Sequence, residues 1–312
     1  MTNTIIENFS SDAMNIKASG VTVEKCIIVG AHKVDGNHND MCQAWDSSDV
    51  VFRGNRLVAY RGPPGPLTAR DVQGLGAYDG WKRRWRVTDC LVATDHPIGI
   101  WIQGDDSCTV TNNTVVRCGA SLFFSSAPTS ILVGPHKSGA VIGGSKVANN
   151  LAEAYRLSGS KAVTKANQTI KPAHLRTAFV RWPVDVHLTQ EAAVARDTGA
   201  ASAVAFIPSH DADDVLRPTT GTVDAGCLQF RPEYTAPRSG PALPATSVTV
   251  VPGLGFDVSW TPNGYRSSSL LVGTTQVALC RTGASSYFVF VPGAGAPGTR
   301  PPSFFVQGVP DL

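Results

Sequence analysis

CTVTNNTVV (residues 108–116) is the stretch that decides the fold, because it holds one unit of a pattern that recurs through the first half of the chain. The unit consists of an apolar residue, two mostly polar residues, an Asn or Cys, any residue, and a second apolar or small residue. Four other segments fit it: VTVEKCII (21–28), VVFRGNRLV (50–58), WRVTDCLV (85–92) and SKVANNLA (145–152). These segments are short, rich in β-branched residues and bounded by Gly, Asn, Asp and Ser, so the pattern predicts β-strands.

Aligning the five units defines three lines of equivalent residues. The first apolar position holds Val23, Phe52, Val87, Val110 and Val147. The Asn/Cys position holds Cys26, Asn55, Cys90, Asn113 and Asn150, and the second apolar position holds Ile28, Leu57, Val92, Val115 and Ala152. The Asn/Cys positions are 29, 35, 23 and 37 residues apart, which indicates a solenoid whose coils carry loops of different size. Asn tolerates the left-handed backbone of a sharp corner, and stacked Asn side chains hydrogen-bond between coils.

The repeat resembles the right-handed parallel β-helix of pectate-lyase-like and polygalacturonase-like proteins, over about residues 15–155. We therefore predict an all-β chain, with a parallel β-helix carrying irregular loops over residues 1–230. Residues 231–245 are rich in Pro and small residues and are expected to form a linker. Alternating apolar runs after the linker predict a small antiparallel β module over residues 246–312.

Composition excludes several classes of protein. Apolar residues make up 42% of the 312 residues, charged residues only 16%, and the net charge is +3, which argues against a helical bundle, a disordered chain and a nucleic-acid-binding protein. No apolar run reaches the ~20 residues of a membrane span, and the opening MTNTIIENFSSDA does not predict a secretion signal. The seven cysteines have no metal-type spacing and predict buried free thiols in a protein made in a reducing cytosol.

HNDMCQAWD (38–46) is the first candidate for chemistry. Asp40 comes just before a predicted strand. Gln43 and Trp45 would share one face of this strand, and Asp46 would be its last residue. Polygalacturonase-like enzymes carry a paired acidic motif in a similar phase, and the resemblance implies that Asp40 and His38 act on a glycan from an exposed sheet face. The alternative is a polar loop in which Asp40 and His38 cap a turn.

QGDDSC (103–108) is similar to the Gly-Asp-Asp motif of the same enzymes, but its phase differs. Asp105 and Asp106 follow a strand, in the place that Ser47 and Ser48 occupy in an earlier coil, and are expected to form a turn. A lyase would instead need carboxylates on one face and a nearby base. The carboxylate candidates are Asp40, Asp46, Asp79 and Asp95, and the base candidates are His38, His96, Lys82 and Arg83. No cofactor is expected; Ca²⁺ held by these carboxylates is the alternative.

RGPPGPLTARDVQGLGAYDGWKRRWR (61–86) is predicted to be the longest insertion between coils. Aromatic faces stack on sugar rings and Arg binds carboxylates, so the segment predicts contacts to an acidic surface glycan. The residues concerned are Tyr78, Trp81, Lys82, Arg83 and Trp85, together with Gln43 and Trp45 from the earlier strand. The alternative places the tryptophans in the core and the basic residues on a solvated face.

The sequence as a whole resembles virion-associated β-helix proteins of the tail-spike, tail-fibre or head-fibre type. That resemblance implies contact with a bacterial surface polysaccharide, a homotrimer, and other virion proteins covering the N-terminal end. The protein would be made in the host cytoplasm and act outside cells on the virion, without binding nucleic acid or membrane. The alternatives are a polysaccharide lyase or glycoside hydrolase and a purely structural β-helix adaptor.

Overall fold

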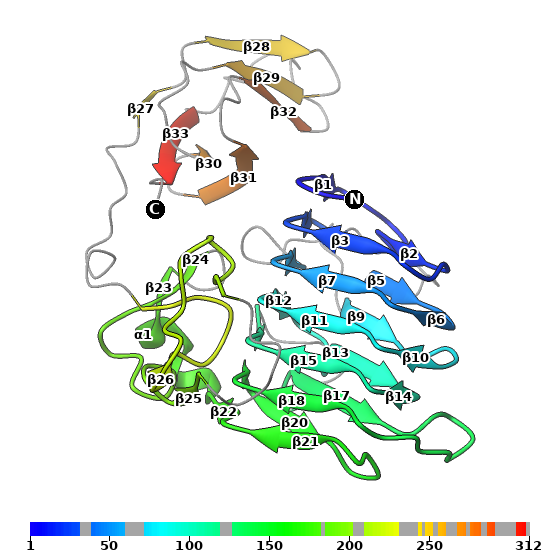
Figure 1. Cartoon of the computed structure of the whole chain (residues 1–312). Coiled ribbons are helices and arrows are strands. Elements are labelled where there is room, and N and C mark those ends of the chain that lie inside the picture. Colours follow the sequence, from blue (N-terminus) through cyan, green and yellow to red (C-terminus); the bar gives the residue numbers. More distant parts are fainter. Residues whose placement is uncertain are drawn as a thin grey trace. The chain divides into compact units, whose positions relative to one another are not determined.

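The computed structural model describes the chain in two compact units, Met1–Thr235 and Ala236–Leu312. The described residues are all except 32–38, 60–71, 119–126, 182–184, 202–208, 231–242, 245–246, 252–254, 260–266, 273–274, 282–285, 291–303 and 310–312. Most elements in the described residues are strands (Figure 1), so the predicted all-β class is confirmed.

The first unit is a stack of coils in which each strand pairs in parallel with its equivalent in the neighbouring coil (Figure 1). Sheet I contains β3 (Thr22–Glu24), β7 (Val51–Arg53), β11 (Arg86–Thr88), β15 (Thr109–Thr111), β18 (Lys146–Ala148) and β21 (Val163–Lys165). Sheet II contains β1 (Ile5–Glu7), β4 (Ile27–Val29), β8 (Arg56–Val58), β12 (Leu91–Thr94), β16 (Thr114–Arg117), β19 (Leu151–Ala152) and β22 (Gln168–Thr169). The architecture is parallel β-helix-like, as the repeat predicts.

Two further parallel sheets complete the coils. Sheet III contains β2 (Asn15–Ile16), β5 (Asp40–Ala44), β9 (Gln73–Ala77), β13 (Ile98–Gln103), β17 (Ser130–Gly134) and β20 (Ala154–Arg156). Sheet IV contains the two-residue strands β6 (Ser47–Ser48), β10 (Lys82–Arg83) and β14 (Asp105–Asp106). Asp105 and Asp106 do occupy the place of Ser47 and Ser48, but they pair as a strand and the predicted turn is wrong.

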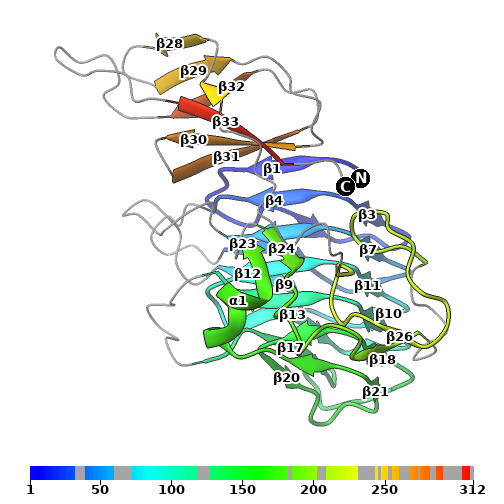
Figure 2. The ribbon, with the colours of Figure 1, turned by 90° about the vertical axis from the view of Figure 1, so that its left-hand side faces the viewer.

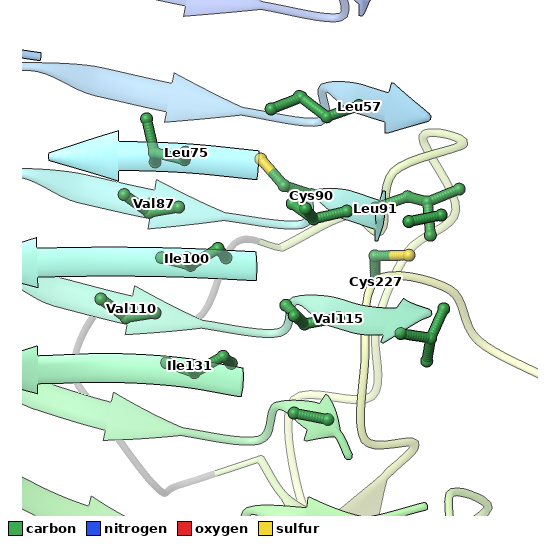
Figure 3. Packing of buried hydrophobic residues seen from close by; sticks show 14 of the residues in the cluster. Leu57, Leu75, Val87, Cys90, Leu91, Ile100, Val110, Val115, Ile131 and Cys227 are labelled. Atoms are coloured by element: carbon green, nitrogen blue, oxygen red, sulfur yellow. The ribbon is translucent and has the colours of Figure 1, made fainter. Parts of the chain in front are cut away.

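The predicted lines of equivalent residues are confirmed by the strand register. Val23, Phe52, Val87, Val110 and Val147 are successive partners in sheet I. Ile28, Leu57, Val92, Val115 and Ala152 are successive partners in sheet II. All ten side chains are buried, and Figure 3 shows several of them stacked along the interior. The hydrophobic core is therefore a column that runs through the coils.

The predicted asparagine stack forms at the corner between sheets I and II. Asn113 donates through Nδ2 to the Val87 carbonyl and to Oδ1 of Asn150, each at 2.9 Å, and Asn150 makes the same bonds one coil further on, to Val110 and Asn167. The left-handed residue of this corner is one position earlier than predicted. It is the residue before each Asn or Cys, for example Asp89 (φ 56°) and Asn112 (φ 54°), because the turn must precede the inward-pointing amide.

Much of the irregular coil length arises between sheets II and III. Residues 59–72 join β8 to β9, whereas Glu153 alone joins β19 to β20. The predicted insertion 61–86 is shorter than expected, because Gln73–Ala77 forms β9 and Lys82–Arg83 forms β10. The sequence QGLGA has no β-branched residue, but its glycines allow close packing: a Cβ on Gly74 would lie 2.1 Å from the Gly99 carbonyl oxygen.

The described parts of residues 170–230 (170–181, 185–201 and 209–230), called the cover segment from here on, leave the coil pattern and pack against the outer face of sheet II (Figure 2). The segment contains a 3₁₀ helix (Pro172–His174), α1 (Leu175–Ala178), β23 (Phe179–Arg181), β24 (Asp185–Leu188), β25 (Gly199–Ala200) and β26 (Thr222–Val223). Its strands pair antiparallel, so among the described residues the coils end at β22 and not at residue 230.

The second unit contains two antiparallel sheets. One consists of β27 (Leu243–Pro244), β30 (Ser267–Val272), β31 (Thr275–Arg281) and β33 (Phe304–Val309). The other consists of β28 (Ser247–Val251), β29 (Gly255–Ser259) and β32 (Ser286–Phe290). The predicted antiparallel β module at the C-terminal end of the sequence is confirmed.

Candidate functional site

The outer face of sheet III presents polar and aromatic side chains. Residues along each of its strands point alternately into the core and outward, and the inward residues form a buried line. Cys42, Leu75, Ile100 and Ile131 are successive inward partners, each at most 1% exposed. The next residue along each strand points outward. These outward partners are Gln43, Gly76, Trp101 and Leu132, with Asn15 before them and Arg156 after them in the same line.

Tyr78 lies over the glycine in this outward line. A Cβ on Gly76 would come 2.6 Å from the Tyr78 ring, so the ring occupies the space that a side chain would fill. The Tyr78 ring centroid is 5.4 Å from that of Trp101, with an angle of 45° between the planes. Both rings are partly exposed, and together they form an aromatic surface on the outside of the coils.

Asp40 fixes the tyrosine in this position. The Tyr78 hydroxyl donates a hydrogen bond of 2.8 Å to Oδ2 of Asp40, and Nε2 of Gln43 donates to the same hydroxyl at 3.4 Å. Burial, with the neighbouring Asp40 carboxylate, raises the pKa of Tyr78 far above its usual range, so the hydroxyl stays protonated. Asp40 itself is fully buried, which corrects the expectation of an exposed carboxylate.

Trp45 extends the aromatic surface toward the first coil. Its ring is 38% exposed, and its Nε1 donates to Oδ1 of Asn15 at 3.3 Å. The ammonium nitrogen of Lys17 lies 5.1 Å from the ring centroid, within the range of a cation–π contact. The predicted shared face of Gln43 and Trp45 is thus present in the structure.

Trp81 lies at the corner between sheets III and IV. Its ring stacks on His136, with centroids 4.8 Å apart and an angle of 9° between the planes. The Arg83 guanidinium lies 5.9 Å from the Trp81 centroid and forms an ion pair of 3.0 Å with the exposed Asp46. These contacts fill one face of Trp81 and neutralise Arg83.

Lys82 and Trp85 are turned into the coil and are fully buried. Lys82 donates through Nζ to the carbonyl oxygens of Asp79 and Gly80, at 2.6 and 3.2 Å, and burial lowers its pKa to about 8. Trp85 donates through Nε1 to the Ser47 carbonyl. The predicted ligand contacts of Lys82 and Trp85 are corrected accordingly: neither side chain reaches the surface, and Trp85 belongs to the core as the alternative states.

The predicted catalytic residues have different surroundings. Asp40 is buried beneath Tyr78, Asp46 pairs with Arg83, and Asp79 is partly exposed. His38 lies outside the described residues. Asp95 accepts a hydrogen bond from the Val72 amide at a buried corner. Among the residues that the structure describes, no group of three His, Cys, Asp or Glu is placed to hold a metal ion.

Sequence reasoning missed Trp101, Asn15 and Lys17. The signal for Trp101 was present in IGIWIQ (98–103), where Ile100 and Ile102 point inward and the residue between them must point outward. Lys17 and Asn15 belong to the first coil, whose strand β2 has only two residues and lacks the repeat.

Comparisons with protein-family models, curated proteins and solved structures find no match for this chain. A search of the described helices finds none that is long and apolar enough to cross a membrane. The six cysteines with described side chains, Cys26, Cys42, Cys90, Cys108, Cys118 and Cys227, are free and buried.

Proposed function

We propose that the outer face of sheet III binds a polysaccharide through Tyr78, Trp101 and Gln43, with Trp45 extending the contact. The observation that carries the proposal is the pair of partly exposed rings, 5.4 Å apart, with a side-chain amide beside them. Aromatic faces cover the apolar faces of sugar rings, and amides pair with their hydroxyl groups. Such surfaces combine apolar contact with polar groups that orient the ligand.

The rings are fixed before a ligand arrives. Tyr78 is held by the buried Asp40 carboxylate and by Gln43, and Trp101 projects from a continuous strand of the core. A surface that is already ordered loses less conformational entropy on binding, so weak contacts contribute more to affinity. Asp40 is therefore a positioning residue in this proposal.

The coil geometry suits a polymeric ligand. Equivalent positions in neighbouring coils are ~4.8 Å apart, so an extended chain along the stack meets the same face repeatedly. The outward line from Asn15 through Gln43 and Trp101 to Arg156 provides such a path.

We propose further that the protein is virion-associated, of the tail-spike, tail-fibre or head-fibre type, and contacts a bacterial surface polysaccharide as a homotrimer. The support for this wider role is the resemblance of the repeat to such β-helix proteins, together with the aromatic face described above. Depolymerase activity is the alternative; because Asp40 is covered, the carboxylate that acts on the glycan would have to be Asp46 or Asp79.

Binding of purified bacterial surface polysaccharides to the intact protein tests the proposal. We expect Trp101→Ala to lower the affinity at least about tenfold, while Arg86→Ala, which changes an exposed residue of sheet I, leaves it unchanged. Equal binding by wild type and Trp101→Ala would place the glycan elsewhere. The same mixtures are assayed for new reducing ends: none are expected, and their release by wild type would establish the depolymerase instead.

A further inference from the structure

We infer that the central part of this surface, around Tyr78 and Trp101, selects an uncharged sugar over an acidic one. The inference rests on the proposed glycan binding and names its substrate class. It reverses the sequence-based expectation of an acidic glycan, which depended on the basic run at residues 82–86. Three features of the structure support it.

The basic run does not supply free cations to the aromatic surface. Lys82 is buried on backbone carbonyl oxygens, Arg83 is paired with Asp46, and Arg84 forms two hydrogen bonds of 2.7 Å with Asp49. A carboxylate on the ligand would have to displace an acidic partner from Arg83 or Arg84 before binding there. Lys82 is therefore out of a ligand's reach, and Arg83 and Arg84 are already paired with carboxylates of the protein.

Two carboxylates of the described residues lie beside the Tyr78 ring. The Asp40 carboxylate accepts a hydrogen bond of 2.8 Å from the Tyr78 hydroxyl, and Asp79 is the next residue in the chain. Both carboxylates act in the same direction as burial in raising the pKa of Tyr78, which shows a negative potential at its hydroxyl. An anionic sugar placed on Tyr78 would meet this potential in a partly desolvated site, where charge repulsion is only weakly screened.

Two side-chain amides lie on this part of the face. Gln43 lies beside Tyr78, and Gln103 follows Trp101 by two residues and so projects from the same side of β13. An amide both donates and accepts hydrogen bonds, which matches hydroxyl and acetamido groups and offers no charge to a carboxylate.

Among the described residues, Lys17 and Arg156 are cations near the two ends of this face. Lys17 sits on Trp45 near the first coil. Arg156 is two coils from Trp101 in the outward line, a separation of ~10 Å. A polysaccharide with widely spaced acidic residues can still bind, provided that the sugar on Tyr78 and Trp101 is neutral.

Carboxyl reduction tests this selectivity, because it converts each carboxylate to a neutral alcohol without changing the linkages. Each acidic surface polysaccharide is offered in its native and its carboxyl-reduced form to wild type, Asp79→Asn and Arg156→Gln. We expect the reduced form to bind wild type at least about tenfold more tightly, with little dependence on salt. Asp79→Asn, at a partly exposed position, is expected to lower the ratio of the affinity for the reduced form to that for the native form. Arg156→Gln is expected to leave this ratio unchanged.

The outcomes separate the two proposals. Tighter binding of the native acidic form, lost in Arg156→Gln or at high salt, overturns the selectivity but keeps the glycan site. Binding of neither form, with Trp101→Ala and wild type alike, overturns the proposed function and with it the selectivity.

Discussion

Sheets II and III belong to the same coils, yet their outer faces have opposite roles. The outward line of sheet II includes Leu91 and Leu151, which are at most 2% exposed because the cover segment packs on them. The corresponding line of sheet III holds Gln43, Trp101 and Leu132, all partly exposed. The backbone is equivalent in the two sheets, so the outward residue alone decides whether a face is covered or presented. In a solenoid, the inner residues specify the fold and the outer residues specify what binds to it.

The cover segment is attached by buried charges as well as by apolar contacts. Arg217 donates to Oδ1 of Asp89 at 2.8 Å, and Asp213 pairs with Arg56 at 2.8 Å and with His187 at 2.7 Å. Burial alone would raise the pKa of Asp213, but Arg56 and His187 outweigh it and hold that pKa well below its usual range. Such pairs define one register for the segment, although their net contribution to stability is small.

Breaking the most buried of these pairs is expected to have the largest effect. Arg217→Met leaves the Asp89 carboxylate alone in the interior, where its pKa is already raised to about 7 despite Arg217. An unpaired buried charge costs about 3–5 kcal/mol of unfolding free energy. Urea unfolding at neutral pH measures this loss.

The matched control for this prediction is the double variant Asp89→Asn with Arg217→Met, because Asn tolerates the left-handed backbone at residue 89. It removes both charges, so it should be more stable than Arg217→Met alone. Lowering the pH should also restore part of the stability of Arg217→Met, because protonation neutralises Asp89. A double variant as unstable as the single one would mean that packing of the Arg217 side chain, and not its charge, holds the cover segment.

Replacing one leucine on each outer face with Ala compares how much each face contributes to stability. Leu151 is fully buried on sheet II, so Leu151→Ala should cost about 2–5 kcal/mol of unfolding free energy. Leu132 is partly exposed on sheet III, so Leu132→Ala should stay within about 0.5 kcal/mol of wild type. Denaturant unfolding of both variants measures the difference. Similar losses would show that sheet III is covered in solution, and the comparison would fail.

The sequence predicts the inner half of each coil well. The lines through Val87 and Val92 and the asparagine stack follow from a period-two pattern with a fixed small residue at the corner. The cover segment could not be predicted, because its contacts join residues far apart in the chain, such as Asp89 and Arg217. The signal was indirect: the outward line of sheet II includes Leu91 and Leu151, and apolar residues on the outer face of a strand need a covering layer.

The candidate site was only partly predictable. Gln43, Trp45 and Tyr78 follow from strand alternation and aromatic content, but Trp101 needs the register between coils, which the variable connections conceal. The prediction that Lys82 and Trp85 contact a ligand was wrong for a physical reason. A corner at Arg84, with φ of 53°, interrupts the strand alternation, so Lys82 and Trp85 both point inward.

Lys82 gives the inner side of this corner a pH dependence. Its folded-state pKa of about 8 lies below the ordinary value of 10.5, so the folded state releases the proton first. The penalty for burying the charge is full below pH 8 and disappears as the pH rises through 10.5. Relative to Lys82→Met, wild type should therefore gain on the order of 1–3 kcal/mol between about pH 7 and about pH 10. A constant difference in urea unfolding across this range would contradict the buried charge.

The smallest expected effect comes from replacing Cys90, which stands between Asn55 and Asn113 in the asparagine stack, with Asn. Asn55 Nδ2 reaches Cys90 Sγ at 4.0 Å, whereas the equivalent Asn113 Nδ2 reaches the Asn150 oxygen at 2.9 Å. Cys90→Asn would supply that oxygen, and its own amide would face the Phe52 carbonyl, which the Cys90 sulfur now contacts at 3.5 Å. We expect a gain of about 0.5–1.5 kcal/mol in unfolding free energy.

Cys90→Ser is the control for this change, because its hydroxyl is too short to bridge two coils. It should not gain stability, so a gain shared by both variants would come from losing the thiol rather than from the asparagine stack. A loss of stability in Cys90→Asn alone would mean that this coil is too closely packed for the larger side chain, although Asn fits the same position in both neighbouring coils. In that case the tight packing of this coil, and not a neutral replacement, would explain why Cys stands at position 90. The identity of each inner corner residue would then be constrained by packing as strictly as the outer residues are constrained by what covers or contacts them.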